Sequence, residues 1–153
     1  MHCHSRRMGP GSFLDSMRQL LNTKEIAMLK LNHLNLPTSN VPALSRFFTE
    51  AFAFRQVGAF GNGKLASLIN DEGFEMLLMH DKHLAAGDHY PTTFHAGFLV
   101  PTREEVHQRH AAILAAGFEA PAPAVIQRGG PPAYGFYCVP PGGVMVEVST
   151  AAE

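Results

Sequence analysis

The chain has 153 residues, 46% of them apolar, which suits one compact domain with a sizeable core but not two independent ones. Twelve basic and thirteen acidic side chains give a net charge of −1, which excludes binding to nucleic acid or to a membrane surface through bulk electrostatics. No apolar stretch approaches a membrane span, and two cysteines, Cys3 and Cys138, fit a reducing compartment better than a disulfide framework. We therefore expect a cytoplasmic protein whose partners are small molecules or other proteins.

Residues 1–26 are predicted to form an N-terminal extension. Residues 1–12 show no periodicity, whereas apolar residues in the following segment recur at the spacing of one helical face. These residues are Phe13, Leu14, Met17, Leu20 and Leu21. The extension should contain one amphipathic helix, at 13–25.

Residues 27–153 form the predicted domain, and its first module spans 27–82. An apolar strand at 28–36 is followed by a turn in which Asn40 can cap a helix, and Pro42 suits the first helical turn. Three further strands, at 56–60, 64–69 and 74–79, are separated by turn signals rich in Gly, Asn and Asp. The order of this module is βαβββ.

The second module, 92–150, repeats this order. A strand at 92–100 precedes a helix that begins with a Thr102 and Glu105 capping box and ends at Gly117. Strands are expected at 124–127, 134–139 and 144–148, the last two joined as a hairpin through a Pro-Pro-Gly-Gly turn. Neither module can bury its sheet alone, so we predict an α+β fold in which the modules form a curled mixed sheet with helices outside.

Three potential metal ligands occupy related places in this repeat. His33 and His95 lie in the first strand of each module, 62 residues apart (95 − 33), and Glu147 alternates with the valines of the final strand. A single histidine is more often a hydrogen-bonded residue of the core or surface, and a carboxylate in an apolar strand needs a compensating positive partner. Together the two imidazoles and one carboxylate would hold a divalent metal with open positions, so the spacing favours a metal site.

Three motifs, in order, resemble those of the vicinal oxygen chelate superfamily. They are the ligand strand Leu-Asn-His-Leu-Asn-Leu at 31–36, the segment Phe-His-Ala-Gly-Phe at 94–98, and the run from Phe136-Tyr137 through Pro141-Gly142 to Glu147. The superfamily contains glyoxalases, extradiol ring-cleaving dioxygenases, fosfomycin resistance thiol transferases and bleomycin-binding proteins. The resemblance covers 29–149 and implies a glyoxalase-like fold with a metal held by His33, His95 and Glu147.

The fourth ligand distinguishes two branches of this superfamily. Glyoxalases place a carboxylate in the last strand of the first module, where comparison of the repeats puts Leu77. Glu75 lies two residues earlier on the same face and is a possible fourth ligand. Extradiol dioxygenases use three ligands, and their tyrosine ten residues before the glutamate matches Tyr137.

Other family features are absent from this chain. The catalytic histidine of the dioxygenases has no counterpart in 124–134, where the nearest ionisable side chain is Arg128. Fosfomycin transferases carry a threonine where this chain has Asn35, and a phosphonate-binding lysine near the place of Gln127 or Arg128.

The resemblance thus implies a metal-dependent enzyme whose substrate chelates through two neighbouring oxygens, with extradiol dioxygenase-like chemistry favoured. Fe(II) is the favoured metal, and Mn, Zn, Ni or Co could use the same ligands. Tyr137 would donate to one substrate oxygen and Arg128 would contact an acidic group. The alternatives are a glyoxalase-type lyase, a fosfomycin-type thiol transferase, and a non-catalytic drug-binding protein in which the histidines are structural.

The ligands are divided between the modules, and this bears on assembly. His33 belongs to the first module, whereas His95 and Glu147 belong to the second. In superfamily members with one pair of modules, the two half-sites commonly come from different chains. We therefore expect a homodimer with two equivalent shared sites; the alternative is one site enclosed within each chain.

Overall fold

The computed structural model describes residues 29–85, 90–127 and 130–151. The chain divides into Met1–Lys30 and Leu31–Glu153, and every helix and strand described below belongs to the second unit. The helix predicted at 13–25 lies outside the described residues.

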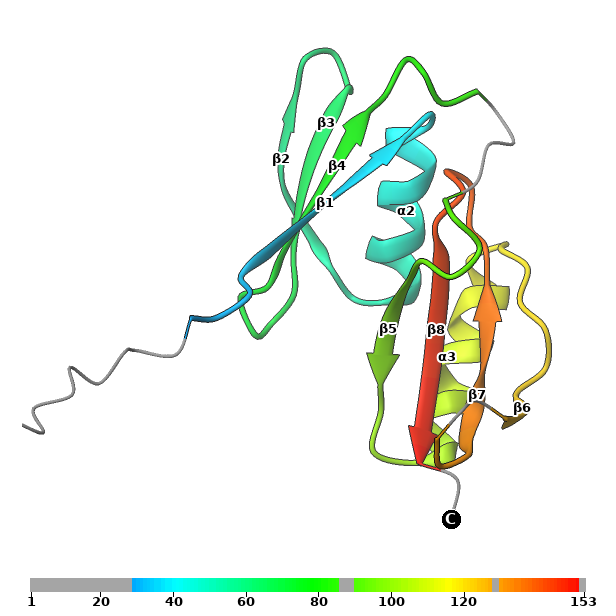
Figure 1. The fold of residues 1–153 in the computed structure, drawn as a ribbon. Helices are drawn as coiled ribbons and strands as arrows, with labels where there is room; N and C mark the ends of the chain where they lie inside the picture. Colours follow the sequence, from blue (N-terminus) through cyan, green and yellow to red (C-terminus); the bar gives the residue numbers. More distant parts are fainter. Residues whose placement is uncertain (1–28, 86–89, 128–129, 152–153) are drawn as a thin grey trace, which may run out of the picture. The chain divides into compact units, whose positions relative to one another are not determined.

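The first module forms a four-stranded sheet with one helix (Figure 1). Its elements are β1 (His33–Thr38), α2 (Val41–Ala51), β2 (Arg55–Phe60), β3 (Leu65–Ile69) and β4 (Glu75–His80). The strand order is β1-β4-β3-β2, with β1 parallel to β4 and the other pairs antiparallel. The sheet is therefore mixed, and α2 packs on one of its faces.

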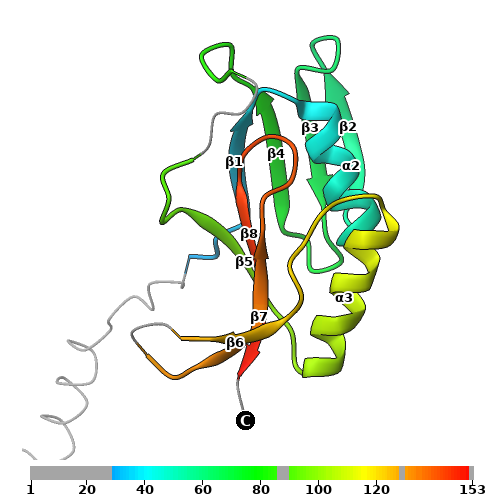
Figure 2. The same cartoon turned by 90° about the vertical axis from the view of Figure 1, so that its right-hand side faces the viewer.

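The second module repeats this topology in its own four-stranded sheet, and Figure 2 shows its helix along one side of that sheet. Its elements are β5 (His95–Leu99), α3 (Arg103–Ala115), β6 (Ala124–Ile126), β7 (Ala133–Cys138) and β8 (Met145–Ala151). The order β5-β8-β7-β6 matches that of the first sheet, and α3 packs on β7 and β8. The predicted pair of βαβββ modules is confirmed, as two four-stranded mixed sheets.

Both helices begin where the sequence predicts. The Asn40 side chain accepts a hydrogen bond from the Ala43 N–H at 3.1 Å, and the Thr102 hydroxyl accepts one from the Glu105 N–H at 3.2 Å. Each cap satisfies a backbone donor that the first turn leaves without an intrahelical partner. Neither described helix is long and apolar enough to cross a membrane.

Phenylalanines from both modules form a common core. Phe98 of β5 packs 4.6 Å from Phe52, between ring centroids, and also contacts Phe48 and Phe54. Phe47 of α2 meets Phe118 edge to face at 5.1 Å. This core lies on the helix-bearing faces of the sheets, so the opposite faces are left for the predicted ligands.

The first strand differs from its prediction at both ends. We expected a strand over 28–36, but β1 runs from His33 to Thr38, and its pairing with β4 begins at Glu75. One backbone hydrogen bond precedes the paired residues of β1 and β4: it joins the Glu75 N–H to the Asn32 carbonyl at 2.8 Å. Residues 29–31 are not paired with another strand. Pro37 is accepted within β1 because β1 is an edge strand, where a missing N–H breaks no ladder bond.

The thiol of Cys138 provides a test of this core. Cys138 is buried on the helix side of β7, and this burial raises its pKa to about 12. At about pH 8 the group is therefore a neutral thiol, which is a poor nucleophile. In a Cys3→Ser variant, we expect a colorimetric disulfide reagent to leave Cys138 unmodified until denaturant is added. Rapid modification of the folded variant would show that this face of β7 is open to solvent.

Candidate functional site

Glu147 lies in the middle of β8 and is only 2% exposed. Its Oε2 accepts a hydrogen bond from the Tyr137 hydroxyl at 2.6 Å, and its Oε1 accepts one from the Ser149 hydroxyl, also at 2.6 Å. Tyr137 is the direct cross-strand neighbour of Glu147 on β7, and Ser149 follows two residues later on the same face. A buried carboxylate is costly without partners, and these two donors meet that requirement at both oxygens.

His95 opens β5, which runs parallel to β8, and its side chain is 40% exposed. Its Nε2 lies 3.3 Å from Oε2 of Glu147, and its Nδ1 lies 3.2 Å from the carbonyl oxygen of Thr93. A carbonyl can only accept, so Nδ1 carries a hydrogen, and in the neutral ring the lone pair is at Nε2. Nε2 lies next to Oε2 of Glu147, so the two are potential ligand atoms for one cation when the ring is neutral.

Two glycines lie beside this pair. Gly97 is the neighbour of Glu147 on β5, so no side chain lies over the carboxylate at that position of the strand. Gly135 is the neighbour of Ser149 on β7, where an added Cβ would lie only 2.1 Å from the Val148 carbonyl oxygen. The close approach of β7 and β8 therefore requires glycine at this position.

His33 lies on the equivalent strand of the other sheet. It is exposed, its Nδ1 lies 2.9 Å from Oδ1 of Asn32, and its partner in β4 is Glu75. Glu75 is half-buried, and its Oε1 accepts a hydrogen bond from the Ser67 hydroxyl at 2.6 Å. An imidazole and a carboxylate thus lie on adjacent strands here as well.

The strand registers show which position of the first module corresponds to Glu147. Glu147 pairs with Gly97, two residues after His95, whereas Leu77 pairs with Asn35, two residues after His33. Leu77 therefore occupies the place of Glu147, 70 residues earlier (147 − 77), and Glu75 is one pleat away on the same face.

The described part of one chain brings together His95, Glu147 and Tyr137. His33 and Glu75 belong to the other sheet, and Arg128 lies outside the described residues. Among the residues that the structure describes, no three His, Cys, Asp or Glu side chains are placed to hold one metal ion. The buried carboxylate and the oriented imidazole suit a divalent cation in their chemistry, but they supply only two of the three predicted ligands.

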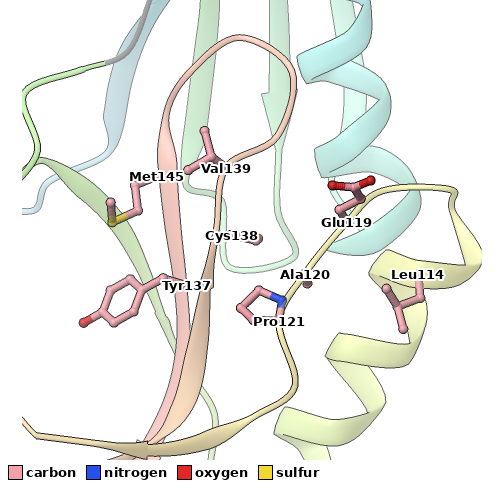
Figure 3. Close-up of a pocket in the computed structure, with 8 residues that line it drawn as sticks. All are labelled: Leu114, Glu119, Ala120, Pro121, Tyr137, Cys138, Val139 and Met145. Carbon is pink, nitrogen blue, oxygen red and sulfur yellow. The ribbon is translucent and has the colours of Figure 1, made fainter. Parts of the chain in front are cut away.

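A cavity of about 580 Å³ borders Tyr137 (Figure 3). Tyr137 and Met145 leave the β7–β8 hairpin on one side, while Cys138 points to the other side, toward α3. The segment after α3 supplies Glu119, Ala120 and Pro121 to the opposite wall. The space beside the tyrosine is of the size that small-molecule sites have in other proteins.

The roles of Ser149, Ser67 and Thr93 were not predicted from the sequence. Alternation places Ser149 on the face of Glu147, so a hydroxyl two residues from a buried carboxylate was a usable signal. The Ser67–Glu75 bond depends on the pairing of β3 with β4, and the His95–Thr93 contact depends on a side-chain rotamer. Neither could be found from spacing.

Comparison with known proteins identifies a family and several solved structures to which this chain is similar. The family model described as Glyoxalase/Bleomycin resistance protein/Dioxygenase superfamily matches residues 30–148. No curated protein matches the chain. Among solved structures, a possible glyoxalase from Bacillus cereus is similar with a TM-score of 0.65 and 29% identity, covering 80% of this chain and 99% of that one.

Two more distant structures share the fold. A lactoylglutathione lyase from Agrobacterium tumefaciens is similar with a TM-score of 0.61 and 18% identity, over 81% of this chain and 95% of that one. A genomically encoded fosfomycin resistance protein from Listeria monocytogenes is similar with a TM-score of 0.61 and 18% identity, over 82% of this chain and 94% of that one.

Proposed function

The chain belongs to the Glyoxalase/Bleomycin resistance protein/Dioxygenase superfamily, and from that premise we propose that it is a divalent-metal-dependent enzyme whose centre is completed by a second copy of the chain. The pairing of His95 Nε2 with the buried Glu147 Oε2 at 3.3 Å carries this proposal. In our proposal the third ligand is His33 of the second copy, which is exposed on the equivalent sheet face and therefore accessible to a partner.

Exposed apolar side chains support the dimer. Phe60 of β2 is 59% exposed, and Met79 of β4 is also exposed. The strand registers place both on the face that carries His33, away from α2. An apolar sheet face of this kind is costly in water, and a second copy would cover it while delivering His33 to the half-site.

The proposed substrate is a small molecule with two neighbouring oxygens. A divalent metal, when bound, would stabilise the negative charge that develops on those oxygens. Tyr137 would contribute its hydroxyl, which now donates to Glu147 and could turn its proton toward a substrate oxygen bound beside the carboxylate. Glu147 and His95 hold two metal positions and leave others open for substrate and for oxygen or water.

We favour oxygen-dependent, extradiol dioxygenase-like chemistry with Fe(II), because Leu77 occupies the position of a fourth ligand. Mn, Zn, Ni or Co could occupy the same ligands. A glyoxalase-type isomerisation is the second candidate. It is favoured by Glu75, which lies beside His33 and is oriented by Ser67, and by the 29% identity to a possible glyoxalase.

One set of assays separates these candidates. The protein would be reconstituted anaerobically with Fe(II) and assayed for oxygen uptake with a panel of catechols, and in parallel with Ni or Zn and the hemithioacetal of methylglyoxal. We expect catechol-dependent oxygen consumption. Turnover of the hemithioacetal without oxygen uptake would identify the glyoxalase branch and a role for Glu75. A folded protein that binds no divalent metal would instead indicate a non-catalytic binding protein.

A further inference from the structure

Ser149 is fully buried, and its hydroxyl donates to Oε1 of Glu147 at 2.6 Å. A buried hydroxyl without a partner would lose the hydrogen bonds that it makes with water, so this bond is favoured in the folded chain. A hydrogen bond to a charged acceptor is also stronger and shorter than one between neutral groups. Ser149 therefore fixes one of the two carboxylate oxygens.

The two oxygens of Glu147 consequently have different surroundings. Oε1 is held by Ser149 within the sheet, whereas Oε2 faces His95 and accepts from Tyr137. We propose that Ser149 is a positioning residue that restricts Glu147 to binding the metal through Oε2 alone, an inference that rests on the proposed function. Binding through one oxygen keeps an additional coordination position available to the substrate.

Gly135 contributes to this arrangement from the neighbouring strand. A Cβ at Gly135 would lie 2.8 Å from the Cβ of Ser149 and 2.7 Å from its Cα. The bare glycine thus allows β7 to pass directly beside Ser149. The hydrogen bond to Oε1 of Glu147 is the contact that orients the seryl hydroxyl.

The matched control lies on the same strand. Thr150 is the next residue on β8, and its side chain lies on the opposite face of the strand from Glu147 and donates to the Pro101 carbonyl at 3.1 Å. Ser67, which donates to Oε1 of Glu75 at 2.6 Å, is not used as a control, because Glu75 pairs with the proposed ligand His33.

The test is a titration of the full-length protein with Co(II), followed by visible absorption, in wild type, Ser149→Ala and Thr150→Val. Partners that orient a ligand commonly change metal affinity by about 10- to 100-fold, so we expect Ser149→Ala to weaken Co(II) binding at least about tenfold and to alter its absorption band. Thr150→Val should remain within about twofold of wild type. Circular dichroism and thermal unfolding would show that each variant is folded.

Each outcome has a distinct meaning. Wild-type affinity in Ser149→Ala would overturn the role of Ser149 while leaving the proposed metal enzyme intact, and an equal loss in Thr150→Val would show that the effect is only structural. A wild-type protein that binds no Co(II) would overturn both proposals.

Discussion

We expect a Gly135→Ala substitution to lower the free energy of unfolding by about 3 kcal/mol, at the upper end of the usual cost of overpacking a core. The added Cβ would lie 2.1 Å from the Val148 carbonyl oxygen and 2.7 Å from the Cα of Ser149. Both are backbone atoms of β8, so relief requires the two strands to separate. Urea unfolding followed by circular dichroism would measure the change.

Gly97 supplies the matched control. It also lies in a strand beside β8, but a Cβ there would meet only Cδ2 of His95, at 4.0 Å, which is an ordinary contact. Gly97→Ala should therefore change the free energy of unfolding by less than about 1 kcal/mol. Equal costs for the two substitutions would show that the close approach at Gly135 does not set the stability of the β7–β8 hairpin.

The second large effect concerns metal affinity. We expect His33→Ala and Glu147→Gln each to weaken divalent metal binding by about 100-fold or more. Loss of a residue that only orients a ligand can already lower metal affinity by up to about 100-fold, and each of these variants removes one of the three ligands itself. His33 is exposed, so its variant should keep the stability of the wild type. The amide introduced by Glu147→Gln would retain an oxygen that can accept from Ser149 or Tyr137, and isothermal titration with Zn or Co(II) would measure both variants.

Much of the fold could be predicted because apolar and polar residues alternate along the segments that form strands. Val146 and Val148 mark the buried face of β8, and both they and Val144, which directly precedes the strand, are fully buried. The same alternation places Glu147 on the other face, where the register with Tyr137 now confirms it. The repeat of a histidine strand, a capped helix and three strands was sufficient to predict the βαβββ element order of both modules, but not the order of the strands within each sheet.

Other features depend on contacts that spacing does not reveal. In α3, Val106 and Ile113 are fully buried, whereas the adjacent Leu114 is 48% exposed, and helical spacing alone does not decide which of these apolar residues faces the core. The start of β1 is set by where β4 begins to pair. The hydroxyl of Ser149 and the carbonyl of Thr93 were missed because their roles follow from side-chain rotamers.

The proposed metal centre depends on the division of its three ligands between the two sheets. His95 and Glu147 meet within one chain, whereas His33 lies in the sheet of the first module. If a second copy completes each centre, a defect in His33 and a defect in Glu147 should compensate for each other when they are on different chains.

The most direct test is therefore to unfold His33→Ala and Glu147→Gln chains together, refold them as an equal mixture, and measure bound Co(II). Shared sites would give each mixed dimer one intact site, so the mixture should recover about one quarter of the wild-type metal content, although neither variant alone binds appreciably. Different mass tags on the two chains would establish by native mass spectrometry that mixed dimers have formed. Mixed dimers that hold no metal would contradict the shared centre.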